Sequence, residues 1–478
     1  MHREAGTYAP SRAAARTTAA AALGPDPGVG NSAVRKRVQS LLNKDFQNDG
    51  EILREIDHIA RQTQRFYLSR WADALDAGGL TLGAERTSRL LAAHMLDVGV
   101  SPGALHRWWT RWGVREPQNF TLAQLLRKVD AELIGHSETF RVAVLCTEKP
   151  TVPPPNFVAP DGVPDWLESM GAPRNWLNGR YKGGLEFSAT ATDPGAAVAI
   201  VQAQIENIQA RLVVGADARA GSLAVYHKAK VSDGPFLRLQ GRRKVEVHAI
   251  ERSGQVYAPS TSHPLESALA LVTQLELSAP TAAIAAGWAS LETVLKAPED
   301  SGAHLVAGRL AKIVACSVSR GELTTLSYHR RQRAKDALGA ILDAEPDNES
   351  RSALLLDVLA AGVELADWSA GDKAGIARMR QLVKTPSKVL RDFVAHLEAA
   401  IVRLYRQRNI VMHGGKQDQA LLQATLRVVA PLVGVGFDRM SHAYFVHGVS
   451  PLDLAAQASH QLQVADALTR ADLTRLLE

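Results

Sequence analysis

The spacing of apolar residues predicts helices over two long parts of the chain. Between residues 32 and 133, apolar positions recur at helical spacing and so fall on one face of each helix. The same spacing returns from residue 265 to the end. Its clearest stripe follows Lys388 and consists of Leu390, Val394, Leu397, Ile401 and Leu404. One further helical turn reaches Arg408, so we expect this charged residue on the inward face.

The middle of the chain has a different pattern, in which short apolar runs alternate with polar residues. This alternation predicts strands over residues 140–145, 185–191, 223–231 and 244–250. Asp193 followed by Pro194 predicts the N-terminal cap and first turn of a helix. No phosphate-binding glycine loop opens this helix. The segment therefore reads as a small α/β region.

These patterns together predict a multidomain, mainly α protein. A proline-rich stretch at residues 150–155 marks a break between helical and α/β sequence. The expected parts are a flexible tail (1–32), a helical domain (33–138), a small α/β domain (139–265), a helical bundle (266–440) and a C-terminal helical extension (441–478).

Composition narrows the class of protein. Of 478 residues, 46% are hydrophobic and 22% are charged, which excludes disorder as the main state. The longest apolar run, residues 428–437, contains Pro431 and is shorter than the roughly 18 residues of a membrane span, so we expect no membrane association. Two cysteines, Cys146 and Cys316, cannot build a disulfide framework or a cysteine zinc site. They favour a reducing, cytoplasmic location, and we expect no metal or cofactor.

The basic charge is concentrated in one segment. The chain carries a net charge of +6, with 40 arginines and 15 lysines. Arginine suits phosphate recognition, although an arginine bias also follows from genomic base composition, and both explanations remain open. Residues 373–416 contain ten Lys or Arg against two acids, a net of +8. This segment has the charge expected of a phosphate-backbone footprint.

Three other motifs favour structural interpretations. Residues 99–103 match the G-x-S-x-G pattern of hydrolases, but Pro102 has no N–H for an oxyanion hole, so we interpret Ser101 as a helix N-cap. Residues 90–109 resemble helix-turn-helix sequence, but adjacent tryptophans at 108 and 109 indicate packing, and we do not expect DNA binding there. The basic run 328–333 is typical of a solvated helix face.

Arg408 and His413 form the strongest candidate for chemistry. Their R-x4-H spacing alone means little, because three other pairs share it: Arg89/His94, Arg243/His248 and Arg391/His396. Only Arg408 is followed by a neutral polar residue, Asn409. Only His413 precedes two glycines, where a helix is expected to stop. An arginine on an apolar stripe also needs a reason, because burying an unpaired charge is costly.

Around this pair the chain resembles the R-x4-6-H signature of HEPN-domain ribonucleases. The matching residues are Arg408, Asn409, His413 and the upstream aromatic Tyr405. Trp288, Leu291, Glu292 and the stretch 304–315 also look like the first two helices of the larger bacterial HEPN proteins. The resemblance covers roughly residues 279–440 and does not extend to residues 1–265.

The resemblance implies a helical bundle that dimerises and cleaves RNA without a metal, in phage defence or as a toxin. His413 would move the proton of the ribose 2′-OH or of the leaving oxygen, Arg408 would hold the phosphate, and Asn409 would orient the pair. Glu292 is a weaker catalytic candidate, since a solvated or capping role fits it equally. The residues expected to contact RNA are Arg391, Arg403, Arg406 and Lys416. We expect a homodimer through residues 388–415. The alternative is a non-catalytic nucleic-acid-binding or scaffold protein with a retired bundle.

Overall fold

The chain is mainly helical and divides into two compact units, residues 1–241 and 242–478. The computed structural model has 71% helix and one small antiparallel sheet, which confirms the mainly α, multidomain class. Its described residues are 19–20, 23–24, 26–44, 50–78, 82–116, 119–150, 153–174, 176–215, 223–239, 243–258, 263–333, 336–363, 368–413 and 419–477.

Helices form the first part of the N-terminal unit. The long α3 packs against the turn η2 and against α6, around the fully buried Leu68 and Trp71. Two helices, α5 and α6, pass directly into π-helical turns, η3 and η4. The elements are η2 (Pro27–Val29), α2 (Ser32–Asn43), α3 (Gly50–Asp76), α4 (Ala84–Asp97), α5 (Pro102–Trp109), η3 (Thr110–Arg115), α6 (Leu122–Val129) and η4 (Asp130–Ile134).

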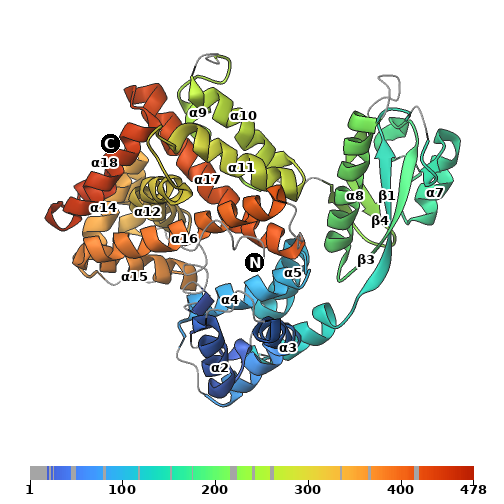
Figure 1. Ribbon diagram of the computed structural model, residues 1–478, viewed down its shortest axis with the longest axis horizontal. Helices are drawn as coiled ribbons and strands as arrows, with labels where there is room; N and C mark the ends of the chain where they lie inside the picture. The colour runs from blue at the N-terminus through green and yellow to red at the C-terminus, as the bar shows by residue number, and fades with distance from the viewer. Residues whose placement is uncertain are drawn as a thin grey trace. The chain divides into compact units, whose positions relative to one another are not determined.

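A five-stranded sheet completes the N-terminal unit, in the order β2-β3-β1-β4-β5 with every neighbouring pair antiparallel. Alternate residues of β1 face opposite layers: Val142 packs toward α8, and Ala143 toward α7. Figure 1 shows α8 and α7 on the two faces of the sheet. The elements are β1 (Glu138–Cys146), β2 (Phe157–Val158), η5 (Pro160–Gly162), α7 (Val163–Ser169), η6 (Trp176–Gly179), β3 (Gly184–Ala191), α8 (Pro194–Gly215), β4 (Val225–Val231) and β5 (Phe236–Arg238).

Three of the four expected strands form, and the fourth does not. Strands β1, β3 and β4 correspond to the runs expected at 140–145, 185–191 and 223–231, and Asp193 caps α8 through the N–H groups of Gly195 and Ala196. The strand expected at 244–250 is wrong: this stretch ends in the short helix α9 (His248–Arg252) and lies in the C-terminal unit.

The reason is that this stretch bonds to helices instead of to a sheet edge. Arg243 donates to three carbonyl oxygens at the end of α10 (Pro264–Leu277), and the Val245 N–H donates to the Glu276 carboxylate over 2.9 Å. Gly434 allows the close approach, because a Cβ there would lie 2.9 Å from the Glu246 nitrogen. Alternating apolar residues are thus buried by a helix surface.

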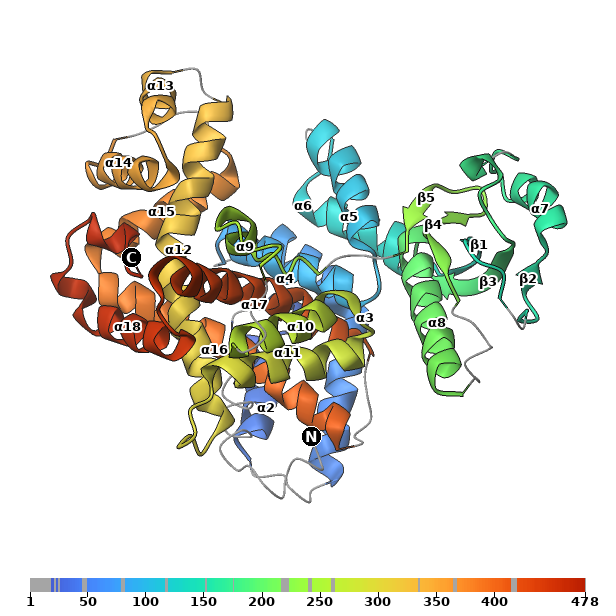
Figure 2. The same cartoon turned by 90° about the horizontal axis from the view of Figure 1, so that it is seen from above.

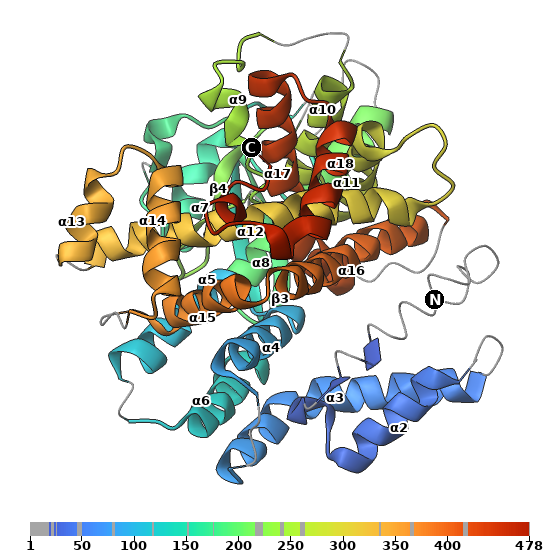
Figure 3. The ribbon, with the colours of Figure 1, turned by 90° about the vertical axis from the view of Figure 1, so that its left-hand side faces the viewer.

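The C-terminal unit is a helical bundle built around α12. This helix packs against α16, α18, α14 and α17 (Figure 3), and α13 and α14 lie beside its C-terminal half (Figure 2). Besides α9 and α10, the elements are α11 (Pro280–Leu295), α12 (Ala303–Arg333), α13 (Ala337–Ala344), α14 (Asn348–Ala360), α15 (Ala370–Lys384), α16 (Pro386–Met412), α17 (Gln419–His447), α18 (Pro451–Val464), η7 (Ala465–Ala467) and η8 (Asp472–Thr474).

Helix α17 contains the longest apolar run of the sequence. Among the described residues it is the one helix long and apolar enough to cross a membrane, and half of its most apolar window is buried inside the protein. Its buried residues include Val433 and Phe437, both fully covered in the core of the bundle. Packing within the bundle therefore accounts for the buried half of this apolar window.

The basic run at the end of α12 is only in part the solvated face that was expected: Tyr328, Gln332 and Arg333 are exposed, but Arg330 is not. Arg330 is only 4% exposed, forms an ion pair with Asp336 and lies over the Trp368 ring. His329 and Arg333 both contact Asp372, each over 2.7 Å. The carboxylates that bind this run come from α13, α15 and the α12–α13 connection, so the pairing depends on tertiary structure.

Candidate functional site

The candidate site lies at the C-terminal end of α16. Pro386 occupies the first turn of the helix, where its missing N–H costs nothing. The inward face then follows the expected stripe, with Leu390, Ile401 and Leu404 fully buried. The next buried residue is Gln407, which is 6% exposed. The stripe therefore continues through a neutral amide.

Arg408 lies at the edge of this stripe and is only half-buried. Its expected place on the inward face is thus taken by Gln407, three residues after Leu404 instead of four. The guanidinium Nη1 donates a hydrogen bond to Oδ1 of Asn409 over 3.0 Å. This contact holds Arg408 with a neutral acceptor, which leaves its positive charge available for an anion.

His413 ends the helix and is exposed. Its backbone N–H donates to the Asn409 carbonyl oxygen over 3.0 Å, and its φ of −101° and ψ of 16° depart from helical values. The expected end of the helix at this histidine is confirmed. The two glycines that follow, Gly414 and Gly415, lie outside the described residues.

Arg408 and His413 do not meet within one chain. Five residues of ideal helix rotate the second position by about 500°, a net separation of about 140° around the axis. The helix ends only after the Cα of His413 has been placed, so the two side chains leave α16 in different directions. One copy of the chain therefore presents Arg408, bonded to Asn409, and the exposed His413 on different faces of the same helix end.

An aromatic contact joins α16 to α11. The rings of Trp288 and Tyr405 lie 4.8 Å apart between centroids and are inclined by 52°. Glu292 follows Trp288 by one helical turn and is half-buried. Within the part of the chain that the structure describes, its carboxylate forms no ion pair with Arg408 or His413. The geometry thus connects the two helices that carry the motif without bringing Glu292 to the pair.

The cations expected to contact RNA differ in their surroundings. Arg391 is exposed, and its Nε donates to the Ser387 carbonyl oxygen over 3.1 Å. Arg403 and Arg406 are half-buried in the last turns of α16. Lys416 lies outside the described residues. The described members of this set therefore extend along one helix toward His413.

Part of the basic segment serves the fold itself. Arg378 on α15 donates to both carboxylate oxygens of Glu322, over 2.9 and 3.0 Å, and Arg380 donates to the Val363 carbonyl oxygen. The lysines of the segment behave differently, because Lys373, Lys384 and Lys388 are all exposed. A hollow of about 390 Å³ on α15 is lined by Lys373, Lys384 and Trp368, among others. Exposed positive charge therefore runs along α15 onto the start of α16.

The other chemically reactive groups in the described part of the chain are its possible metal ligands and its thiols. No group of three or more His, Cys, Asp or Glu side chains among the described residues is placed to hold a metal ion. Both cysteines are buried, and burial raises the pKa of the Cys146 thiol to about 11 and that of Cys316 to about 12.

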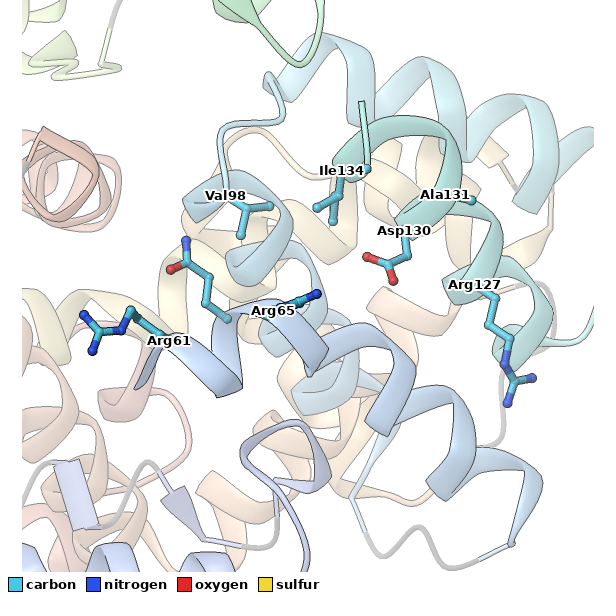
Figure 4. Close-up of a pocket in the computed structure, with 9 residues that line it drawn as sticks. Arg61, Arg65, Val98, Arg127, Asp130, Ala131 and Ile134 are labelled. Carbon is cyan, nitrogen blue, oxygen red and sulfur yellow. The ribbon is translucent and has the colours of Figure 1, made fainter. Parts of the chain in front are cut away.

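The N-terminal unit has its own open hollow, of about 610 Å³, between α3 and η4 (Figure 4). Asp130 lines it, and burial raises the pKa of this carboxyl. Arg127 points away from it and bonds to Asp73 and Asp76 instead, both over 2.8 Å. Three arginines line the hollow, and two of them are paired with acids: Arg127, and Arg61, which lies 2.6 Å from Asp57.

The arginine and histidine at the end of α16 are therefore the observation on which a functional interpretation rests. No protein-family model matches the chain, and no curated protein or solved structure is significantly similar to it.

Proposed function

We propose that the chain is a metal-independent endoribonuclease of the HEPN type, with its site at the C-terminal end of α16. One observation carries this proposal: Asn409 holds the Arg408 guanidinium at 3.0 Å, and an exposed histidine ends the same helix five residues later. A fixed cation and an exposed imidazole are the minimal set of groups for cleaving a ribose phosphodiester once both reach the same phosphate.

The reaction needs only these groups and the RNA. The ribose 2′-oxygen attacks the adjacent phosphorus, the bond from phosphorus to the 5′-oxygen breaks, and a 2′,3′-cyclic phosphate forms. An imidazole is suited to both proton transfers, because the unperturbed pKa of histidine lies near neutrality. Arg408 would neutralise the charge that develops on the phosphate oxygens. Asn409 would keep the guanidinium in place between turnovers.

The separation of the pair supports a site that two copies of the chain complete. With the two side chains on different faces of α16, Arg408 of one copy and His413 of another reach a shared phosphate more easily than a pair within one copy. Helix α16 is also incompletely covered: Phe393, Val394 and Leu397 are only partly buried. We therefore propose a homodimer whose interface includes residues 388–415.

The charge of the segment supports RNA as the polyanion. Lys373, Lys384, Lys388 and Arg391 are exposed along α15 and α16 and would follow the phosphate backbone. Arg403, Arg406 and Lys416 would contact phosphates nearer the cleavage site. We place the enzyme in the cytoplasm, in phage defence or as a toxin, with the N-terminal unit as sensor or specificity module.

The test compares two histidines on the same helix. The purified full chain is incubated with mixed RNA in EDTA as wild type, His413→Ala and His396→Ala. His396 is the matched control, because it has the same R-x4-H spacing to Arg391 and is also exposed. We expect wild type and His396→Ala to cleave and His413→Ala to be inactive.

Other outcomes separate the alternatives. RNA binding without cleavage in all three proteins would favour the non-catalytic nucleic-acid-binding protein. Cleavage that survives His413→Ala, or that disappears in EDTA and returns with a divalent ion, would contradict the proposed chemistry.

A further inference from the structure

The C-terminal unit contains a second cationic site, in a cavity away from the end of α16. This cavity has a volume of about 310 Å³, and its lining comes from α9, α12, α14 and α17. The charged and titratable residues that line it are Arg252, Arg320, Asp438, Arg439 and His442. None of its lining residues belongs to α16. The cavity therefore requires an explanation other than the proposed cleavage site.

Three arginines and one carboxylate, Asp438, are among the described residues that line the cavity. Asp438 accepts two hydrogen bonds from Arg252, over 2.9 and 3.1 Å, and one from the Ala249 N–H over 2.7 Å. Glu349 lies 3.7 Å from Arg320 and also pairs with Arg475. The third acid near Arg320 is Asp347, which is engaged in capping α14. Each of these three acids is therefore also engaged by a group other than Arg320 or Arg439.

Burial makes the positive charge of this lining costly. Burial is the main cause of a lowered pKa at Arg320 and at Arg439, and the two guanidinium groups repel each other at Arg439. The pKa of His442 is lowered as well, first by burial and then by His447 and Arg439. Arginine remains charged in proteins, so a bound anion would relieve this repulsion.

We propose that this cavity binds a small phosphorylated molecule, with its phosphate group held by Arg320 and Arg439. The planar guanidinium fork matches two phosphate oxygens, and two such groups from different helices enclose the anion. Ser253, Thr324 and Asn348 also line the cavity and supply neutral hydrogen-bonding groups for the rest of the molecule. The volume lies at the lower end of small-molecule sites, which admits a nucleotide and excludes an RNA helix.

Calorimetry on the full chain tests the proposal with defined probes. These are inorganic phosphate, pyrophosphate, adenosine diphosphate and a short RNA without terminal phosphates. We expect pyrophosphate and adenosine diphosphate to bind with Kd below about 1 mM, and the RNA to leave the cavity empty. Failure of every small phosphorylated probe to bind would overturn the proposal. This result would not bear on RNA cleavage, because the α16 residues lie elsewhere.

Two variants locate the binding. Arg439→Gln removes a guanidinium, and we expect it to weaken pyrophosphate binding at least about tenfold. Gly321→Leu leaves every charge in place but fills the cavity, because a Cβ at this helical glycine meets no atom within 4 Å. We expect it to fold at least as well as wild type and to lose binding. If Arg439→Gln fails to fold, pyrophosphate binding by Gly321→Leu still tests whether the cavity is the binding site.

The matched control is Arg89→Gln, which removes the same charge from an exposed ion pair with Glu85 in the N-terminal unit. It should bind pyrophosphate as wild type does. Equal binding by wild type and Gly321→Leu would overturn the assignment to this cavity. The proposed class of ligand would be overturned if the small probes do not bind but the RNA does, and if Gly321→Leu abolishes that RNA binding.

Discussion

Ser101 and Asp193 connect the helical part and the sheet part of the N-terminal unit. The Asp193 carboxylate accepts hydrogen bonds from the backbone N–H and the hydroxyl of Ser101, over 2.8 and 2.6 Å. Each residue also caps its own helix, Ser101 at α5 and Asp193 at α8. Gly195 leaves room for the contact, since a Cβ there would lie 2.4 Å from the Ser101 hydroxyl oxygen. The serine of the hydrolase-like motif is therefore structural, as expected.

Replacing Asp193, the acceptor that both helices share, should lower the free energy of unfolding more than replacing Ser101. We expect Asp193→Ala to lower the free energy of unfolding by about 3 kcal/mol, because five N–H or O–H groups lose one buried partner. Ser101→Ala removes one cap and should cost about 1 kcal/mol. Urea unfolding of both variants measures the difference. Equal costs would show that the carboxylate does not join the two helices.

Asn409 is expected to act by positioning Arg408. Asn409→Ala should lower kcat for RNA cleavage about tenfold, because the guanidinium loses its 3.0 Å acceptor, with little change in melting temperature. Asn409→Asp should lower cleavage further, since a carboxylate would pair with Arg408 and compete with phosphate. Steady-state kinetics of the two variants test this order. An Asn409→Asp enzyme as active as wild type would contradict it.

Mixed dimers test the shared site directly. Arg408→Ala and His413→Ala proteins should each be inactive, but a mixed dimer keeps Arg408 from one chain and His413 from the other. Random mixing should restore about a quarter of wild-type activity, because half the dimers are mixed and each has one intact pair. Cleavage assays after refolding the mixture measure the recovery. A fully active monomer by light scattering would exclude a site shared in this way.

The stability of the N-terminal unit should depend on pH through His94. Burial lowers the pKa of His94 to about 4, from 6.5, and its ring stacks on Tyr67 at 4.3 Å. Between pH 4 and pH 6.5, His94 therefore carries a proton in the unfolded state but not in the folded state. The free energy of unfolding should fall by up to about 3 kcal/mol as the pH drops from 6.5 to 4. Below pH 4, His94 should cause no further change in this free energy.

This dependence is measured by urea unfolding at a series of pH values, with proteolytic cleavage within residues 50–134 as the readout. His94→Gln serves as the comparison, and its pH profile should be flatter over the same range. Parallel profiles for wild type and variant would rule out His94 as the cause.

The two thiols should not react with alkylating reagents until the protein unfolds. Cys146 is fully covered within β1 and Cys316 is 4% exposed, and burial raises the pKa of both above 10. At pH 8 neither should react appreciably with iodoacetamide in the native chain, because the thiolate is the nucleophile. Mass spectrometry with and without urea compares the rates. Similar labelling in both conditions would contradict the burial of these side chains.

The outcome of sequence-based prediction depended on how local each signal was. Strands β1 and β3, the Asp193 cap and the end of α16 were predictable, because their signals lie within a few residues. The stretch 244–250 misled because alternation does not reveal whether a sheet or a helix end buries it. The cavity could not be foreseen, since Arg252 and Asp438, which pair across it, are 186 positions apart in the sequence.

The hydrogen bonds from Arg243 to the end of α10 determine where the chain can be divided into fragments that fold. A fragment that begins at residue 266 would lose the group that satisfies three terminal carbonyls of α10, and would leave the Asp438 carboxylate without Arg252. Such a piece would resemble a bundle in sequence yet fold poorly by itself. The smallest autonomous fragment is expected to begin at residue 242, so the bundle carries part of the apparent α/β sequence as its own.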